Sequence, residues 1–282
     1  MSHVSPHRDD ATSLRDACEE LGEPTMVCRP SRAKSVIWLL AASAVYITGV
    51  AFAVVALALQ GMSAAVVVGS VLALAGAAFA VAQLRGLSLR VHVCRDGFAV
   101  ARGTTVETCR WGDVEALWER VTTNYWMPAG IPVSLGTAYK FRVRRADGAE
   151  FVFAGNTSGG QLLLPGNLHG VAELGAAIRD ATHHRLLSQA EASVRAGGAV
   201  AFGRLQVGAA GLSSGVGTLP WSEVEGITVN DDGKLVVRKA GQWRNWYKVK
   251  ASAVPNLSVF LALVHQITAR GGSADGVGRP PA

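Results

Sequence analysis

Charged side chains are missing from one long part of this 282-residue chain, between Ser35 and Leu84. This absence excludes an ordinary surface helix, which keeps a polar stripe along one side. A single helix of that length would be about 75 Å long, whereas the hydrocarbon core of a bilayer is about 30 Å thick and takes about 20 residues. The composition therefore predicts a membrane protein with a two-helix transmembrane hairpin at residues 35–84, broken at Gln60-Gly61-Met62-Ser63.

The two predicted spans have few bulky aromatic side chains and many small ones. Small residues let two helices approach closely, so we expect the spans to pack on each other through Gly49, Ala53, Gly69, Ala73, Gly76 and Ala77. Neither span contains the buried charge or broken helix that is typical of pores and transporters. The pair is therefore interpreted as an anchor, with a buried globular hairpin as the alternative.

The flanks of this stretch are basic, although the chain as a whole is only modestly so, with 27 Lys and Arg against 21 Asp and Glu. Basic flanks around an uncharged connection predict that both ends of a hairpin lie in the cytoplasm; the flanking residues are Arg29, Arg32, Lys34, Arg85, Arg90 and Arg95. We therefore expect a multi-pass protein of the plasma membrane with both termini cytoplasmic.

The two ends of the chain show little apolar patterning. Residues 1–34 mix Pro, Ser, His and acidic residues, and only Leu14, Cys18 and Leu21 form an apolar stripe at helical spacing. Residues 1–34 are therefore predicted to be a mostly disordered cytoplasmic tail, and residues 271–282 a second disordered tail.

Cysteine is scarce, and its spacing does not suit a metal site. The four cysteines form no Cys-x-x-Cys pair, and the seven histidines are not grouped with them, whereas a zinc site needs four ligands at short spacings. In a reducing cytoplasm the cysteines are expected to be free thiols. The sequence predicts no metal and no other cofactor.

Sequence motifs of enzymes are weak in this chain. Gly211 to Gly215 match the Gly-x-Ser-x-Gly spelling of a hydrolase, but loop and strand follow instead of a helix, so Ser213 is interpreted as a turn residue. Asp113 and Glu115 alternate on one predicted strand and are interpreted as solvated acids. No set of acid, base and nucleophile can be assembled, so we expect a protein that is not an enzyme. The alternative is a membrane-bound enzyme with an unrecognised site between two β domains.

The second strong signal is an internal repeat after residue 85. Short strand-like runs end at a turn before Gly97 in the first copy and before Gly211 in the second. Trp111 and Trp221 then begin a shared Trp-x-Asp/Glu-Val motif, and an amphipathic helix closes each copy, at about 171–186 and 256–270. The first copy is longer, with the extra residues assigned to a loop at 124–136.

Antiparallel strands followed by one helix resemble the pleckstrin-homology-like (PH-like) architecture, in which a helix closes two nearly orthogonal sheets. The repeated motifs also resemble bacterial membrane proteins of unknown function that combine a transmembrane hairpin with cytoplasmic PH-like domains. The resemblance implies PH-like β domains at residues 85–190 and 195–270. The expected function is that of a membrane-anchored cytoplasmic binding or scaffolding protein acting at the inner leaflet.

The candidate contact surface is a basic strand face in the second copy. Alternate residues of a strand share a face, which groups Lys234, Arg238, Arg244, Trp246, Lys248 and Lys250. Such a face suits anionic lipid headgroups of the bilayer or an acidic protein partner, with an ordinary solvated face as the alternative. Nucleic acid is an unlikely partner because the basic surplus is too small.

Overall fold

The computed structural model describes residues 9–30, 32–58, 63–87, 89–127, 133–157 and 168–274. The chain forms two compact units, each assembled from separate segments. Unit 1 comprises Met1–Arg110, Asn124–Thr137 and Ala154–Leu174, and unit 2 comprises Trp111–Thr123, Ala138–Phe153 and Gly175–Ala282. The division between the units falls within single strands and within one helix, so it does not coincide with the predicted domain limits.

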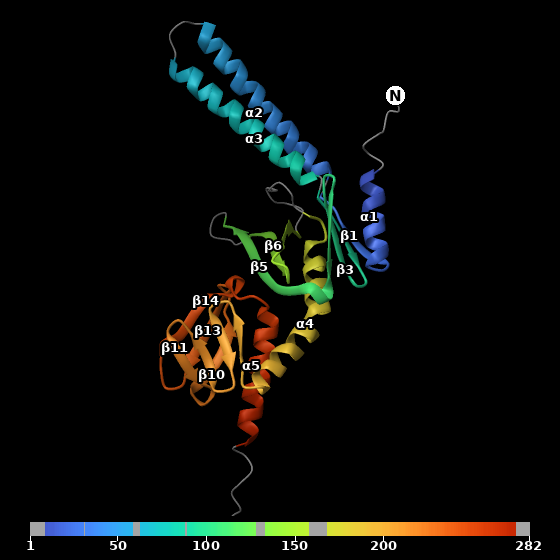
Figure 1. Ribbon diagram of the computed structural model, residues 1–282. Helices are drawn as coiled ribbons and strands as arrows, with labels where there is room; N and C mark the ends of the chain where they lie inside the picture. The colour runs from blue at the N-terminus through green and yellow to red at the C-terminus, as the bar shows by residue number, and fades with distance from the viewer. Residues whose placement is uncertain are drawn as a thin grey trace, which may run out of the picture. The chain divides into compact units, whose positions relative to one another are not determined.

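Unit 1 contains a four-stranded antiparallel sheet with strand order β1-β2-β3-β4. Helix α1 covers one face of this sheet (Figure 1), where Leu14, Cys18 and Leu21 form an apolar cluster with residues of β2 and β3. Residues 9–30 therefore differ from the predicted disordered tail, because their apolar stripe is buried against the sheet. The elements are α1 (Asp9–Glu20), β1 (Pro24–Cys28), α2 (Arg32–Ala58), α3 (Ser63–Leu87), β2 (Leu89–Cys94), β3 (Gly97–Arg102) and β4 (Thr105–Arg110).

Helices α2 and α3 pack against each other along their length (Figure 1). Their backbones approach most closely at small residues. A Cβ atom added to Gly49 would lie 2.7 Å from the backbone nitrogen of Ala73, and one added to Gly69 would lie 2.8 Å from that of Ala53. The predicted packing of two helices through small residues is confirmed. Of the predicted break at residues 60–63, residues 60–62 lie outside the described residues, and Ser63 begins α3.

The predicted membrane topology is wrong. A helix that crosses a bilayer needs about 20 predominantly apolar residues, and within the described ranges no helix is long and apolar enough to cross a membrane. This finding overturns the transmembrane hairpin at residues 35–84 and the multi-pass plasma-membrane location with both termini in the cytoplasm. The stretch lacks charged side chains, but that absence alone does not establish a membrane span.

Strands β5, β6 and β7 form a three-stranded sheet in that order. The predicted loop at 124–136 is different in the structure, because β5 continues to Trp126 and β6 begins at Val133, so that most of the extra residues lengthen two strands. Their Thr, Tyr and Val residues favour strands. Residues 128–132 lie outside the described part. The elements are the 3-10 turn η1 (Trp111–Asp113), β5 (Val114–Trp126), β6 (Val133–Arg145), β7 (Glu150–Asn156) and α4 (Val171–Arg195).

The rest of unit 2 contains two further antiparallel sheets and a closing helix. Their strand orders are β11-β10-β9-β8 and β12-β13-β14. Helix α5 packs against them through Phe260, whose ring meets that of Phe202 edge-on at 5.3 Å between centroids. The elements are β8 (Ala199–Phe202), β9 (Leu205–Gly208), β10 (Gly211–Ser214), β11 (Gly217–Pro220), η3 (Trp221–Glu223), β12 (Val224–Val229), β13 (Lys234–Lys239), β14 (Asn245–Lys250), η4 (Ala251–Ala253) and α5 (Leu257–Ala274).

The predicted repeat is present in the order of the elements. Each copy runs through a four-stranded sheet, a 3-10 turn that begins with Trp, a three-stranded sheet and a helix. Gly97 and Gly211 occupy equivalent positions, because each begins the third strand of its four-stranded sheet. The first copy therefore begins at β1 rather than at residue 85. Helices α2 and α3 are inserted between its first two strands.

All four cysteines are buried thiols that form no disulfide. Burial, with a smaller contribution from the charge of Glu173, raises the pKa of Cys28 to about 11. Burial and a hydrogen bond with Cys18 raise the pKa of Cys94 to about 12. Because the thiolate is the reactive form, these thiols are held in their unreactive state.

We expect a thiol-reactive dye at pH 8 to label the folded chain slowly at Cys28 and Cys94. Raising the pKa of Cys28 from 9.0 to about 11 lowers its thiolate fraction about 100-fold. Mass spectrometry of peptides after timed labelling measures the rate at each cysteine. The same chain in urea serves as the control and should label quickly at all four sites. Fast labelling of Cys28 or Cys94 in the folded chain would contradict this expectation.

Candidate functional site

The outer side of the β12-β13-β14 sheet carries a cluster of basic residues. Alternate residues of a strand point to opposite faces, and Leu235 and Val237 of β13 are buried in the core of unit 2. The opposite face is formed by the alternate residues of β13 and by their partners on β14. These are Lys234, Val236 and Arg238 with Lys250, Lys248 and Asn245, respectively. We call the four basic residues on this side the basic face: Lys234, Arg238, Lys248 and Lys250.

The charges of the basic face are only partly balanced. Lys234 stands directly opposite Lys250 across the ladder, an arrangement that like charges make unfavourable. The Lys234 amino group lies 3.5 Å from a carboxylate oxygen of Asp232, which offsets part of this repulsion. Among the described residues, no acidic side chain forms an ion pair with Arg238, Lys248 or Lys250. The face can therefore accept several anionic groups.

Trp246 does not lie on the basic face, contrary to the alternation expected from the sequence. The register of the two strands shifts, because Val237 pairs with Tyr247 and Arg238 pairs with Asn245. Trp246 is the extra residue of this bulge, and a bulge changes the direction of the side chains around it. Its ring is partly buried against the core of unit 2, with its centroid 6.1 Å from that of Tyr247. Trp246 therefore contributes to packing.

Arg244 lies in the turn before β14, where it accompanies a different tryptophan. Its guanidinium carbon is 4.8 Å from the ring centroid of Trp243, and the Trp243 side chain is 87% exposed. The next residue, Asn245, is the cross-strand partner of Arg238. The exposed aromatic contact of this region is thus Trp243. In the sequence, Trp243 is marked only by its position among basic residues, and Trp246 has the same kind of position.

The corresponding strand of the first copy is also basic, but its charges are largely engaged. The Arg142 guanidinium lies 4.0 Å from the ring centroid of Trp118 and 3.9 Å from a carboxylate oxygen of Glu150. Arg144 forms two hydrogen bonds with the carboxylate of Glu115, at 3.1 and 3.2 Å. The two copies therefore share the basic strand but differ in charge balance, and the second copy is the better candidate for binding.

The candidate catalytic and metal-binding motifs are not assembled into a site. Ser213 lies within strand β10, and its hydroxyl is 2.9 Å from that of Thr218 on the neighbouring strand. This is a cross-strand pair of hydroxyls, not the strand-to-helix turn that a hydrolase nucleophile requires. In the part of the chain that the structure describes, no group of three or more His, Cys, Asp or Glu side chains could hold a metal ion.

Comparison with known proteins gives a match to a protein family. A family described as a family of unknown function, DUF6585, matches residues 12–271. No curated protein and no solved structure matches the chain. The matched range includes both copies of the repeat together with the helical pair inserted in the first.

Proposed function

Because the chain belongs to the DUF6585 family, whose function is unknown, we propose its function from the geometry of the basic face. The protein is a non-catalytic binding protein, and the basic face binds an acidic segment of a protein partner. This proposal rests on the unbalanced positive charge of the basic face. Arg238, Lys248 and Lys250 lack acidic partners among the described residues, and Lys234 is held opposite Lys250.

The spacing of the charges favours an extended acidic segment. Side chains two residues apart on one strand are about 7 Å apart, and this holds for Lys248 and Lys250 as well as for alternate residues of an extended peptide. Acidic residues at every second position of such a peptide would therefore meet successive lysines. Exposed ion pairs contribute at most about 1 kcal/mol each, so several are needed and binding should weaken with salt.

The exposed Trp243 supplies an apolar contact beside these charges. Tryptophan and arginine are enriched among the residues that dominate binding energy in protein interfaces. Trp243 is 87% exposed, and Arg244 is stacked on its ring. An exposed pair of this kind supports a protein partner with both acidic and apolar residues.

The element order of residues 199–274 is that of a compact β domain closed by a helix. Strands β8 to β14 form two sheets and are followed by the closing helix α5. A compact β domain with a basic outer face and no assembled catalytic set among its described residues suits a binding role better than catalysis.

We expect charge reversal of the basic face to weaken binding of the full chain to a synthetic peptide of alternating Glu and Ser. The variant Arg238→Glu/Lys248→Glu/Lys250→Glu loses three pairs, so its dissociation constant should rise about 10- to 100-fold at low salt. The matched control Arg95→Glu/Arg102→Glu/Arg110→Glu changes the net charge equally at exposed arginines of unit 1. It should bind nearly as well as the wild type. Isothermal titration calorimetry at two salt concentrations measures both effects.

Vesicle binding distinguishes the other class of partner. Co-sedimentation with anionic and neutral vesicles is measured for the same three proteins. If the peptide binds the wild type and the basic-face variant equally, the proposal is overturned. It is also overturned if the face binds only anionic vesicles, since the face would then recognise a lipid surface.

A further inference from the structure

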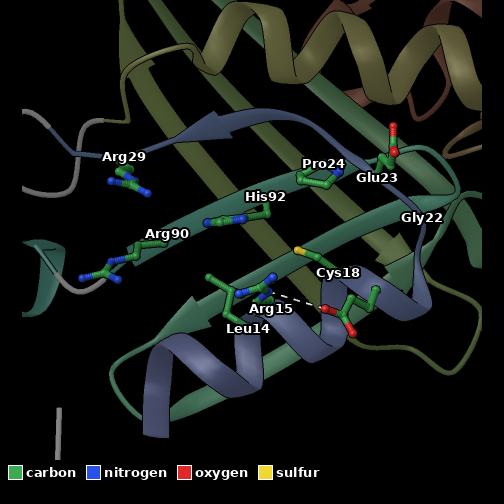
Figure 2. Close-up of a pocket in the computed structure, with 10 residues that line it drawn as sticks. Leu14, Arg15, Cys18, Gly22, Glu23, Pro24, Arg29, Arg90 and His92 are labelled. Atoms are coloured by element: carbon green, nitrogen blue, oxygen red, sulfur yellow. Dashed lines mark ion pairs between the residues drawn. The ribbon is translucent and has the colours of Figure 1, made fainter. Parts of the chain in front are cut away.

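Unit 1 contains a pocket of about 810 Å³ between helix α1 and strands β1 and β2 (Figure 2). Pockets for small molecules are usually between about 300 and 1,000 Å³ and combine apolar walls with a few polar groups. All residues that line this pocket belong to unit 1. Its function is therefore independent of the basic face in unit 2.

One end of the pocket is cationic. The antiparallel register pairs Cys28 with Val91, so the next position of the ladder brings Arg29 opposite Arg90. His92 follows two residues after Arg90 on the same face of β2, and Figure 2 shows the three basic side chains at the same end of the pocket. Among the described residues, neither arginine forms an ion pair with an acid. Two arginines that face each other without a paired carboxylate favour the binding of an anion between them.

His92 has an unmet hydrogen-bonding atom at this end. Its Nε2 atom is buried and has no hydrogen-bond partner in the described structure. Burial and the positive charges of Arg29 and Arg90 lower the pKa of His92 below its usual value. The imidazole is therefore held neutral, and its tautomer with a proton on Nε2 would donate a hydrogen bond to an oxygen atom placed between the arginines. A buried polar atom without a partner is uncommon in proteins.

The remaining walls combine apolar residues with an ion pair and one further acid. Leu14 and Cys18 are buried on the pocket side of α1, and Pro24 begins β1. Two acids also line the pocket. Glu19 forms an ion pair with Arg15 at 3.5 Å, and Figure 2 shows Glu23 beside Pro24, away from the cationic end. The arrangement separates an anion-binding end from an apolar wall.

We infer that this pocket binds a small amphiphile with one oxyanion group, either a carboxylate or a phosphate monoester. Arg29 and Arg90 contact the oxyanion with their guanidinium groups, and His92 donates a hydrogen bond to it. The apolar body of the ligand lies against Leu14 and Cys18. The site is a binding site, and no covalent step is involved.

Calorimetric titration of the full chain with decanoate, decyl phosphate and decanol tests this inference. The two anions differ in headgroup, whereas decanol keeps the apolar body without the charge. We expect at least one anion to bind about tenfold or more tightly than decanol, because bidentate arginine contacts require the oxyanion. Equal binding of decanol, or no binding of either anion, would overturn the inference.

Variants of the cationic end identify the residues responsible. Arg29→Gln/Arg90→Gln should weaken binding of the preferred anion about tenfold or more, whereas Arg110→Gln, an exposed arginine on β4 that does not line the pocket, should leave it unchanged. Circular dichroism checks that each variant is folded. If the double variant is unfolded, anion binding is measured with His92→Phe instead. Phenylalanine also has an aromatic ring, but it lacks the hydrogen-bond donor. Unchanged anion affinity in the folded variant tested would exclude this site.

Discussion

Replacing Gly211 by alanine is expected to destabilise the β8–β11 sheet by about 2–4 kcal/mol. An added Cβ atom would lie 2.2 Å from the carbonyl oxygen of Leu219, which is far closer than van der Waals contact allows. Leu219 is buried, and Gly211 pairs with Pro220 on the neighbouring strand. Because a backbone atom rather than a flexible side chain blocks the space, the ladder itself has to move.

Hydrogen exchange of peptides that cover β9 to β11 measures this loss of stability locally. Gly226→Ala is the matched control, because an added Cβ would meet no atom within 4 Å, and its effect should stay within about 0.5 kcal/mol. Gly97→Ala should act like the Gly211 variant in the first copy, since its Cβ would lie 2.3 Å from the carbonyl oxygen of Cys109. Wild-type exchange rates in both Gly211→Ala and Gly97→Ala would contradict the expectation.

Replacing Asn256 by alanine is expected to lower the free energy of unfolding of unit 2 by about 2–4 kcal/mol. The Asn256 side chain accepts a hydrogen bond from the backbone N–H of Leu117 at 2.8 Å and donates one to the carbonyl of Glu115 at 2.9 Å. Both partners lie on β5, so one side chain joins the start of α5 to a strand of the first copy. Asn256 also has a φ of +50°, which asparagine tolerates better than alanine.

A series at this position separates the two contributions. Asn256→Gly removes the side-chain hydrogen bonds but tolerates the positive φ, so it should be less harmful than Asn256→Ala. Asn256→Asp keeps the acceptor for the Leu117 N–H and loses the donor to the Glu115 carbonyl. Urea unfolding followed by tryptophan fluorescence gives the ranking, and wild-type stability of Asn256→Ala would show that the hydrogen bonds are replaced by others.

The elements that were predicted well are those specified by local chemistry. The turns before Gly97 and Gly211, the motifs that begin at Trp111 and Trp221, and the closing helices all have short-range signals. The repeat made each signal more specific, because it occurs twice in the same order. The predicted helix ends were less accurate. The first closing helix was predicted at about 171–186, whereas α4 continues to Arg195.

The elements that were missed depend on contacts between distant residues. Strand β1 is a short segment that becomes a strand because it pairs with β2, beyond the whole helical pair. The pocket in unit 1 combines residues near position 20 with residues near position 90 for the same reason. Trp246 was placed on the wrong face because a strict alternation cannot anticipate a bulge. The uncharged stretch gave a strong compositional signal, and the transmembrane hairpin that it predicted was wrong.

The position of the helical pair between β1 and β2 affects the entropy of forming that strand pair. In the second copy, the equivalent strands β8 and β9 are joined by the short turn at Gly203 and Arg204. In the first copy, residues 29–88 separate them, and closing a flexible loop of that length would cost about 3 kcal/mol more. Once α2 packs on α3, however, the two ends of this segment lie near each other (Figure 1). The helical pair then shortens the effective loop, and β1 can join β2 at nearly the entropic cost of a tight turn.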